Sequence, residues 1–384
     1  MQRTNGRLWS VAGILAVAML VGCSPAQTQS VSDGPDTPFK LATFETAGKI
    51  RVGLVLGEQV LDIAGASEHL VSEAGVPGMT MPDEMRALIE DYDRVSPRLY
   101  QIANYYSANP PANLPFAFDV GAVSIKAPIK YPWNLLAAAA NYRAHAEGMG
   151  GASGGEPRGG QQAAQAGGGQ PPQRRGGFDP TAASRIVPER DAPVFFAKSP
   201  RSCIIDPGEP YYIPPGRERM DWEGEMAIII GKPAYMVPAD KTHDYVFGYS
   251  ILYDVSDRGG RTREVSMFPG PNWFDGKSTN RGAPFGPYIV PKEFLPNHAN
   301  LRLVTKVNGV VKQDQTTADL IWNEPNMLAY LTTILQLYPG DVISTGTPAG
   351  TGAERREFLK PGDVVEIELE GVGTLTTPFE AYKK

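Results

Sequence analysis

The stretch RMDWEGEMAIIIG, residues 219–231, combines a strand pattern with three acidic side chains. Side chains at positions i, i+2 and i+4 of a β-strand point to the same face, so Asp221, Glu223 and Glu225 are expected to converge. The isoleucines that follow are typical of a buried strand. Three carboxylates on one face need either water or a bound positive charge. The pattern alone favours a solvated face and leaves a cation site open.

Length and composition are those of a globular protein. The 384 residues suffice for a large domain with a small one, or for two domains of ordinary size. Hydrophobic residues make up 42% of the chain and charged residues 20%, as in other globular proteins. The net charge is −6 and no dense run of Lys and Arg occurs, which argues against nucleic-acid binding. We expect small-molecule or protein partners.

The first 23 residues have the pattern of an export signal. Arg3 and Arg7 precede the apolar run VAGILAVAML, which is short for a membrane span. The sequence LVGC at residues 20–23 resembles a bacterial lipobox, in which the cysteine is lipidated and becomes the mature N-terminus. We therefore expect a signal peptide, a lipid on Cys23, and membrane attachment through that anchor alone.

The expected location is the cell envelope, on the periplasmic side. Ser24 after the lipidated cysteine favours the outer membrane over the inner one. The alternative is an ordinary cleaved signal with an incidental cysteine. Cys203 is the only other cysteine, so a lipidated Cys23 leaves no pair for an intramolecular disulfide.

A flexible tether and a small α+β domain follow the signal. Residues 24–38 are rich in Ser, Pro, Gln and Asp and contain too little apolar surface to pack. Residues 39–118 are expected to form the small domain. Within it, residues 39–64 predict three short antiparallel strands, and residues 81–108 predict a helical region interrupted by Pro97.

The remaining residues, 119–384, predict a larger β-rich domain. Its many short strand-like runs are separated by Pro and Gly. One clear helix is expected within residues 323–341, ended by Pro339 and Gly340. The predicted fold class is therefore α+β and β-rich, with a mixed β-roll or sandwich domain beside the small N-terminal one.

A glycine-rich segment at residues 148–177 interrupts the larger domain. It contains 12 glycines in 30 residues and no aromatic side chain, so it cannot build a core and is expected to be disordered. By itself it could be an inert insertion or an enlarged flap over a site.

Six motifs in a fixed order resemble those of the fumarylacetoacetate hydrolase family, which includes fumarylacetoacetase, acylpyruvase and 2-hydroxyhepta-2,4-diene-1,7-dioate isomerase-like enzymes. The resemblance covers residues 39–382 apart from the glycine-rich segment. The motifs are NYRAHAEGMG (141–150), PVFFAKSP (193–200) with GEPYYIPPGRERMDWEGEMAIIIGKPA (208–234), VFGYSILYDVSDR (246–258), FDGKSTNRGAPFGPYIV (274–290), LRLVTKVNGVVKQDQTTADLIW (301–322) and LYPGDVISTGTPAGTG (337–352).

This resemblance implies that Glu223, Glu225 and Asp254 bind a divalent cation. The residue types agree with that implication, because an all-carboxylate set suits Mg²⁺ or Mn²⁺ better than zinc. Asp221 is expected beside the ligands and not among them. Lys277 matches the family's active-site lysine and would offset the negative charge.

The implied reaction is cleavage of a carbon–carbon bond in a 2,4-dioxo, acylpyruvate-like carboxylate through a metal-stabilised enolate. His145, with a carboxylate partner, is the candidate that activates water. Decarboxylation or keto–enol isomerisation of 2-oxo acids at the same site remains an alternative, as does a metal-binding envelope protein without catalysis. A homodimer is expected because family members commonly form one.

The sequence departs from the family pattern beside His145. The family's glutamate three residues after the histidine is replaced by Gly148, and the nearest acid is Glu147. A shift of one residue turns a helical side chain by about 100°. Glu147 is therefore the candidate partner of His145, and two alternatives stay open, a broken pair or a pair remade with another acid after the flap rearranges.

Other departures affect groups around the substrate. Asn280 stands where the family often has Asp, Tyr253 stands where it has Asn, and Arg261 stands where it often has Gln. The candidate substrate-binding residues are Tyr142, Arg258, Arg261 and Thr347.

Thr347 belongs to GTPAGTG, residues 346–352, which resembles the family loop that lines the site. This loop is not a P-loop, because no Gly-Lys-Ser/Thr follows. The glycine-rich segment begins just after His145, where the family keeps a flap, so an enlarged flap is favoured over an inert insertion.

Overall fold

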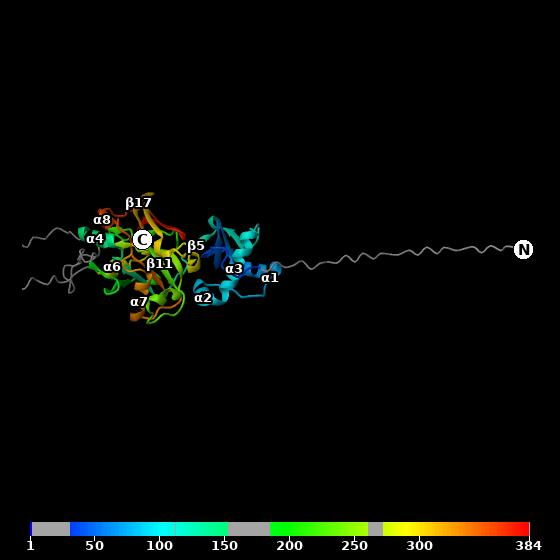
Figure 1. The fold of residues 1–384 in the computed structure, drawn as a ribbon. Coiled ribbons are helices and arrows are strands. Elements are labelled where there is room, and N and C mark those ends of the chain that lie inside the picture. Colours follow the sequence, from blue (N-terminus) through cyan, green and yellow to red (C-terminus); the bar gives the residue numbers. More distant parts are fainter. Residues whose placement is uncertain (2–30, 112, 153–184, 260–271, 384) are drawn as a thin grey trace, which may run out of the picture.

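The computed structural model describes Met1 and residues 31–111, 113–152, 185–259 and 272–383, which form two units in Figure 1. The smaller unit is blue to cyan and the larger unit is green to red. The predictions for the signal peptide, Cys23, most of the glycine-rich segment and Arg261 lie outside the described residues.

A five-stranded sheet with the order β4-β3-β2-β1-β5 forms the smaller unit. The first three strands lie where the sequence predicts them, and the sheet extends past residue 118 to Lys126. Helices α1 and α3 pack on this sheet and on each other. The elements are β1 (Lys40–Thr46), β2 (Lys49–Leu56), β3 (Gln59–Asp62), α1 (Ile63–Ala74), α2 (Met85–Glu90), α3 (Tyr92–Ala108), β4 (Ala117–Asp119), η1 (Val120–Ala122) and β5 (Ser124–Lys126).

The expected interruption at Pro97 is wrong. Helices α2 and α3 are separated at Asp91, and Pro97 lies inside α3. A proline inside a helix removes one backbone hydrogen bond. The apolar face of α3 offsets that loss by packing, because Val95, Leu99 and Ile102 are fully buried.

The larger unit contains two main sheets. One has the order β15-β12-β11-β18-β6-β7 and the other β17-β16-β19-β20-β9. The first sheet is made of β6 (Leu135–Ala139), β7 (Val194–Ala197), β11 (Gly224–Ile230), β12 (Val246–Tyr253), β15 (Val290–Pro291) and β18 (Val342–Ser344). The second is made of β9 (Tyr211–Ile213), β16 (Arg302–Val307), β17 (Val310–Thr316), β19 (Val364–Leu369) and β20 (Gly373–Ala381). Two short pairs complete the strands, namely β8 (Ile204–Ile205) with β14 (Ala283–Pro284) and β10 (Met220–Asp221) with β13 (Ser256–Asp257).

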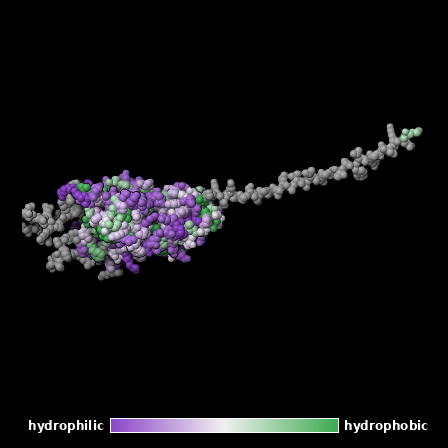
Figure 2. Space-filling model, turned by 60° about the horizontal axis from the view of Figure 1, so that its bottom comes forward, coloured by the Kyte–Doolittle hydropathy of each residue, from purple (hydrophilic) through white to green (hydrophobic). Residues whose placement is uncertain are grey.

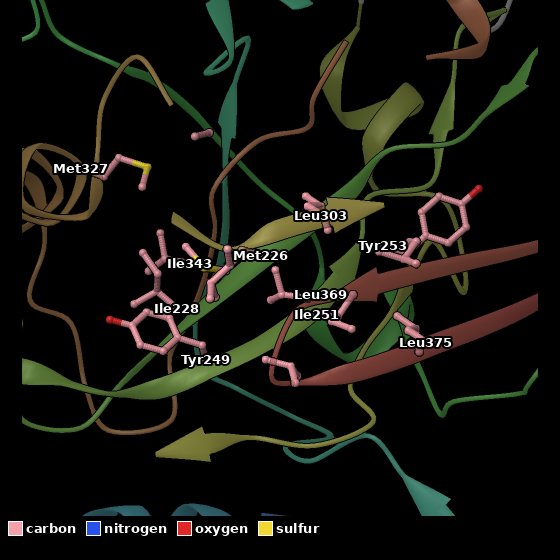
Figure 3. Packing of buried hydrophobic residues seen from close by; sticks show 14 of the residues in the cluster. Met226, Ile228, Tyr249, Ile251, Tyr253, Leu303, Met327, Ile343, Leu369 and Leu375 are labelled. Atoms are coloured by element: carbon pink, nitrogen blue, oxygen red, sulfur yellow. The ribbon is translucent and has the colours of Figure 1, made fainter. Parts of the chain in front are cut away.

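A shared apolar core lies between these two sheets. Strand β11 contacts β16, and β12 contacts β19. Every residue of β11 and β12 is buried. Figure 3 shows Met226, Ile228, Tyr249 and Ile251 from the first sheet beside Leu303, Leu369 and Leu375 from the second. The prediction of a β-rich α+β fold is confirmed.

Short helices surround these sheets. In Figure 1, α4, α6 and α8 lie toward the end of the larger unit that is remote from the smaller unit. Helix α7 is the predicted helix, but it ends at Ile334, before Pro339. The elements are α4 (Arg143–Ala152), α5 (Pro200–Cys203), η3 (Ala239–Tyr245), α6 (Trp273–Lys277), η4 (Lys292–Phe294), η5 (His298–Asn300), η6 (Thr317–Asp319), α7 (Glu324–Ile334) and α8 (Gly352–Arg355).

The face drawn in Figure 2 is mainly hydrophilic, with a green area over the larger unit. In the part of the chain that the structure describes, no helix has both the length and the apolar character needed to cross a bilayer.

Candidate active site

Residues 219–231 do not form one continuous strand. Strand β10 ends at Asp221, β11 begins at Gly224, and the two residues between them belong to neither. The strand alternation expected from Asp221 through Glu225 is therefore interrupted at residues 222 and 223. Asp221 instead accepts hydrogen bonds from the backbone amides of Gly352 and Ala353 and from Arg258.

Glu223, Glu225 and Asp254 do come together. Each can place a carboxylate oxygen within 4.8 Å of the other two, and all three side chains are buried. Antiparallel pairing of β11 with β12 explains this, because the start of β11 lies beside the end of β12. The backbone amide of Asp254 also donates to the carbonyl of Glu223 at 3.0 Å. We call these three residues the carboxylate cluster.

Three cationic side chains surround the carboxylate cluster. Lys277 Nζ lies 2.5 Å from Asp254 Oδ2 and also contacts Glu223. Lys198 Nζ contacts the other oxygen of Asp254. Arg258 joins Asp221, at 2.8 Å, to Glu223. With Asp221 and the carboxylate cluster counted as four negative charges, these three cations leave one net negative charge.

Sequence reasoning missed Lys198. This side chain is 1% exposed, and its ammonium group also donates to the carbonyl oxygen of Lys277. A signal was present in the sequence, because the motif PVFFAKSP places a lysine directly after an apolar strand pattern. A lysine at such a position is rarely buried unless it is paired.

Glu225 has no direct ammonium partner among the described residues. Its Oε2 accepts hydrogen bonds from Ser344 Oγ and, at 2.9 Å, from the amide of Gly346. Burial and the neighbouring Asp254 charge raise the pKa of Glu225 to about 7. Burial also opposes ionisation of Asp254, yet Lys198 and Lys277 hold the pKa of Asp254 below its ordinary value.

The carboxylate cluster fits a hard divalent cation. All its donors are oxygen atoms, which Mg²⁺ and Mn²⁺ prefer. The net negative charge and the position of Glu225, which lacks an ammonium contact of its own, also favour an added positive charge. Glu223, Glu225 and Asp254 are the residues that would hold it.

His145 contacts Glu354, which comes from a distant part of the sequence. Helices α4 and α8 contact each other, and the Nδ1 atom of His145 meets Glu354 Oε1. Glu354 Oε2 also accepts a hydrogen bond from the amide of Gly350 at 2.6 Å. The side chain of Thr351 caps the start of α8. These contacts fix the carboxylate beside the imidazole.

The prediction that Glu147 is the partner of His145 is wrong. Glu147 is exposed, whereas His145 is buried. Two residues along a helix correspond to a rotation of about 200°, so the two side chains point to opposite sides of α4. A Cβ atom added at Gly148 would lie 3.1 Å from the carboxyl carbon of Glu354. Glu354 therefore fills the space next to the position where the family pattern has its glutamate.

The charge states of this pair suit proton transfer. Burial lowers the pKa of His145, although Glu354 opposes that change. Burial would raise the pKa of Glu354, but the His145 contact and the Gly350 amide hold it below its ordinary value. A neutral imidazole beside a carboxylate donates through Nδ1, which leaves the Nε2 lone pair able to accept a proton.

One cleft brings these groups together. Its lining includes His145, Glu223, Glu225, Arg258, Lys277 and Thr347, together with Ala138, Ala139, Ala140, Phe196 and Trp273. The structure thus joins the carboxylate cluster to the His145 pair and to two of the candidate substrate-binding residues. A small anionic molecule in this cleft would meet cationic side chains on one side and an imidazole on another.

The remaining candidate substrate-binding residues that the structure describes have hydroxyl groups that are already hydrogen-bonded or buried. Thr347 lines the cleft, but its hydroxyl donates to the Gly224 carbonyl at 3.0 Å and accepts from Gln313 at 2.8 Å. The Tyr142 hydroxyl is buried and has no hydrogen-bond partner among the described residues. Burial, with a contribution from the Glu225 charge, raises the pKa of Tyr142. Tyr253, which replaces a family asparagine, is a core residue.

The chain is similar to known proteins in sequence and in fold. Residues 135–380 match the family described as fumarylacetoacetate (FAA) hydrolase C-terminal. An uncharacterized protein of Staphylococcus aureus (strain USA300) is 40% identical over 162 residues, which are 42% of this chain and 52% of that protein. The chain therefore spans about half the length of the curated relatives it matches.

Solved structures resemble nearly the whole chain. Maleylpyruvate hydrolase from Sphingobium sp. SYK-6, in complex with manganese(II) and pyruvate, is 25% identical with a TM-score of 0.60. That similarity covers 90% of this chain and 100% of the hydrolase. The 5-carboxymethyl-2-hydroxymuconate delta-isomerase from Mycobacterium smegmatis is 25% identical with a TM-score of 0.58, over 90% of this chain and 100% of the isomerase.

Proposed function

Because this chain belongs to the fumarylacetoacetate hydrolase family, we propose that it hydrolyses a carbon–carbon bond in a small 2,4-dioxo carboxylate of the acylpyruvate type. One observation carries this proposal, namely that His145, which is paired with Glu354, lines the same cleft as Glu223 and Glu225 of the carboxylate cluster. Hydrolysis needs a base for water, and the pair supplies one.

The carboxylate cluster gives the site its proposed cofactor. When bound by Glu223, Glu225 and Asp254, Mg²⁺ or Mn²⁺ would act as a Lewis acid toward the oxygens of a 2-oxo carboxylate. The related hydrolase solved with manganese(II) and pyruvate supports this assignment of ion and substrate class. We propose either Mg²⁺ or Mn²⁺ as the ion, and the assays described below compare the two.

The cationic side chains would orient the substrate. Arg258 and Lys277 line the cleft, and Lys277 is held by Asp254 and by Ser256 Oγ at 2.7 Å. A substrate carboxylate would be attracted to these charges and so held with its second carbonyl toward His145. Arg258 is further fixed by its contact with Asp221.

His145 and Glu354 would activate the attacking water. The Nε2 atom of His145 would take a proton from water, while Glu354 holds the imidazole by Nδ1 and stabilises the imidazolium that forms. The same imidazolium can return the proton to the carbon of the departing fragment. An acidic side chain at position 148 is not needed, because Glu354 serves as the carboxylate partner of His145.

Keto–enol isomerisation is the second candidate. The isomerase similarity is as high in identity as the hydrolase similarity. Isomerisation requires proton transfer but no attacking water, so the same cleft could carry it. Decarboxylation of a 2-oxo acid likewise needs no water activation.

A panel of substrates distinguishes these reactions. Purified protein is incubated with acylpyruvates, oxaloacetate and a ketonised hydroxymuconate, each with Mg²⁺, with Mn²⁺ and with a chelator. We expect metal-dependent release of pyruvate together with a free acid from an acylpyruvate. Release of CO₂ from oxaloacetate with acylpyruvates left intact would contradict hydrolysis. Absence of metal-dependent turnover across the panel would indicate a binding protein.

Variants refine the test. Glu354→Gln should reduce hydrolysis by about 100-fold or more and retain metal binding, because Glu354 is outside the carboxylate cluster. Glu147→Gln is the matched control and should keep full activity, because Glu147 is exposed on the other side of α4.

We also propose that Cys23 carries a lipid that holds the protein on the periplasmic side of the envelope, and that the protein is a homodimer. The lipobox-like sequence at residues 20–23 supports the first proposal. Mass spectrometry of the mature N-terminus checks the lipid, with Cys23→Ala expected to release the protein from membranes. Sedimentation of the soluble form checks the dimer.

A further inference from the structure

A second group of potential metal ligands lies outside the proposed active site. His243, His298 and Glu324 each offer one ligand atom, and these atoms lie within 4.8 Å of one another. They come from η3, η5 and the first residue of α7. Two of the four histidines in the chain are therefore in this group, which the proposed function does not use. We call it the histidine cluster.

Glu324 is the buried centre of the histidine cluster and is 4% exposed. Its Oε2 atom accepts a hydrogen bond from the Tyr249 hydroxyl at 2.7 Å. Its Oε1 atom lies 2.8 Å from His243 Nδ1 and 3.9 Å from His298 Nε2. Tyr249 thus holds one oxygen, and the other is directed at both histidines. Tyr249 lies on β12 beside Ile228, as Figure 3 shows.

Ring packing fixes His298. Its imidazole stacks on His243, with ring centroids 4.8 Å apart, and on Tyr249, with centroids 5.0 Å apart. The Nδ1 atom is buried without a partner among the described residues. The Nε2 atom, at 3.9 Å from Glu324, is beyond hydrogen-bond range.

These separations suit an ion between the three side chains. Zinc bonds to nitrogen and oxygen are about 2.0–2.2 Å long, so two ligands of a tetrahedral ion lie about 3.4 Å apart. The observed distances of 2.8 and 3.9 Å fall on either side of that value. Stacked imidazoles cannot both direct an in-plane lone pair at one ion, so the His243 ring must turn out of its stack on His298 when the ion binds. Its side chain is 45% exposed and has room to turn.

We propose that His243 Nδ1, His298 Nε2 and Glu324 Oε1 form a zinc site whose fourth position is open to water. Two imidazoles and one carboxylate are an established zinc ligand set. This chemistry differs from the all-oxygen carboxylate cluster, which suits Mg²⁺ or Mn²⁺. The two clusters would therefore select different metals in one chain.

The charged groups near the cluster are Glu324 itself, Asp244 and Lys292, whose ammonium group donates to the His243 carbonyl at 2.6 Å. Zinc with one carboxylate and two neutral histidines leaves one positive charge, and the Asp244 and Lys292 charges offset each other.

A bound ion would cross-link three distant segments. Residues 243, 298 and 324 are far apart in the sequence, and Tyr249 connects them to the central strand β12. Zinc that binds only the folded protein must stabilise it. The region that it would stabilise is the part of the larger unit where α7 packs against η3.

Zinc titration tests the proposal directly. The protein is prepared without an affinity tag, stripped of metal, and titrated with Zn²⁺ against a chromophoric chelator in excess Mg²⁺. A Glu223→Gln, Glu225→Gln background removes the carboxylate cluster as a competing zinc site. We expect one equivalent of zinc in this background. His243→Gln and His298→Gln should each weaken its binding at least about tenfold.

The control is His69→Gln. His69 lies in the smaller unit, where its Nδ1 atom contacts the Tyr106 hydroxyl at 2.7 Å, and its loss should leave zinc affinity unchanged. His243 is partly exposed, so His243→Gln should fold even if His298→Gln does not. As a second measurement, Co²⁺ should give the visible spectrum of a tetrahedral ion that His243→Gln eliminates. Unchanged zinc affinity in folded His243→Gln would overturn the proposal.

Discussion

The two clusters of metal-ligating side chains in the larger unit differ in charge, burial and origin. The carboxylate cluster is fully buried, contacts Lys277, Lys198 and Arg258, and contains only oxygen donors. The histidine cluster reaches the surface, has one carboxylate, and is held by ring stacking and by Tyr249. The first is organised by charge compensation and the second by packing. Replacing a ligand should therefore affect turnover and stability at the carboxylate cluster, and zinc binding at the histidine cluster.

The largest effect is expected at Asp254, because two ammonium groups depend on it. Asp254→Asn should remove metal-dependent turnover, by about 100-fold or more. Because it leaves buried Lys198 and Lys277 without their shared carboxylate, it should also lower the free energy of unfolding by about 3 kcal/mol. Turnover with Mg²⁺ or Mn²⁺ and urea unfolding measure the two effects.

Glu225→Gln is the matched variant for that experiment. Glu225 is held by Ser344 and the Gly346 amide and by no ammonium group among the described residues. It should lose turnover to a similar degree with a much smaller loss of stability. Equal destabilisation by both variants would contradict the view that charge compensation is centred on Asp254.

The next largest effect is expected at Glu354. Glu354→Gln should reduce the rate of hydrolysis by about 100-fold or more, because the imidazolium of His145 loses its carboxylate. The burial-lowered pKa of His145 places the acidic limb of the kcat/KM profile below the ordinary histidine pKa of about 6.5. Since Glu354 raises the pKa of His145, its removal should move that limb to still lower pH. A pH–rate profile of both proteins measures this shift.

Retention of the wild-type profile by Glu354→Gln, or a rate loss in Glu147→Gln of the same size, would show that the His145–Glu354 contact is not the functional pair. Metal binding serves as the internal control, because neither glutamate belongs to the carboxylate cluster.

A smaller effect is expected at Gly148. A Cβ atom there would approach the Glu354 carboxyl carbon to 3.1 Å and its Oε1 atom to 3.4 Å. Gly148→Ala should shift the carboxylate by a few tenths of an ångström and lower hydrolysis several-fold, since small displacements of a positioned group are costly. Steady-state kinetics with an acylpyruvate measures the change. A fully active Gly148→Glu variant would mean that Glu354 can move aside without loss.

The acidic stretch at residues 219–231 shows what the sequence could reveal. Glu223 and Glu225 are close in sequence, and Asp254 directly follows β12, the strand that pairs with β11, so a strand pattern and a family resemblance sufficed to group them. The break between β10 and β11 was not predictable from alternation, because it depends on Asp221 finding the amides of α8. Local sequence patterns predict strands, but a contact with a distant segment can still end a strand early, as at Asp221.

Glu354 and the histidine cluster illustrate the limit of such patterns. Glu354 is 209 residues from His145, and nothing in the GTPAGTG region marks it as a partner. His243, His298 and Glu324 lie in three separate segments without ligand spacing of the kind that identifies zinc motifs. Both groupings depend on tertiary packing, of α4 with α8 and of η3 with α7.

The smallest expected effect is the stabilisation of the protein by zinc, which should depend on the histidine cluster and not on the carboxylate cluster. Zinc at about ten times its Kd should stabilise the folded protein by about 1.4 kcal/mol. For a protein of this size that corresponds to a rise in Tm of roughly 2 °C. His243→Gln should remove the rise, while turnover with Mg²⁺ or Mn²⁺ stays at the wild-type level because His243 does not line the active-site cleft. Differential scanning calorimetry and the acylpyruvate assay, run on the same samples, measure both. A loss of turnover in parallel with the loss of zinc would mean that the histidine cluster acts on the cleft through β12, and that the two clusters are not independent.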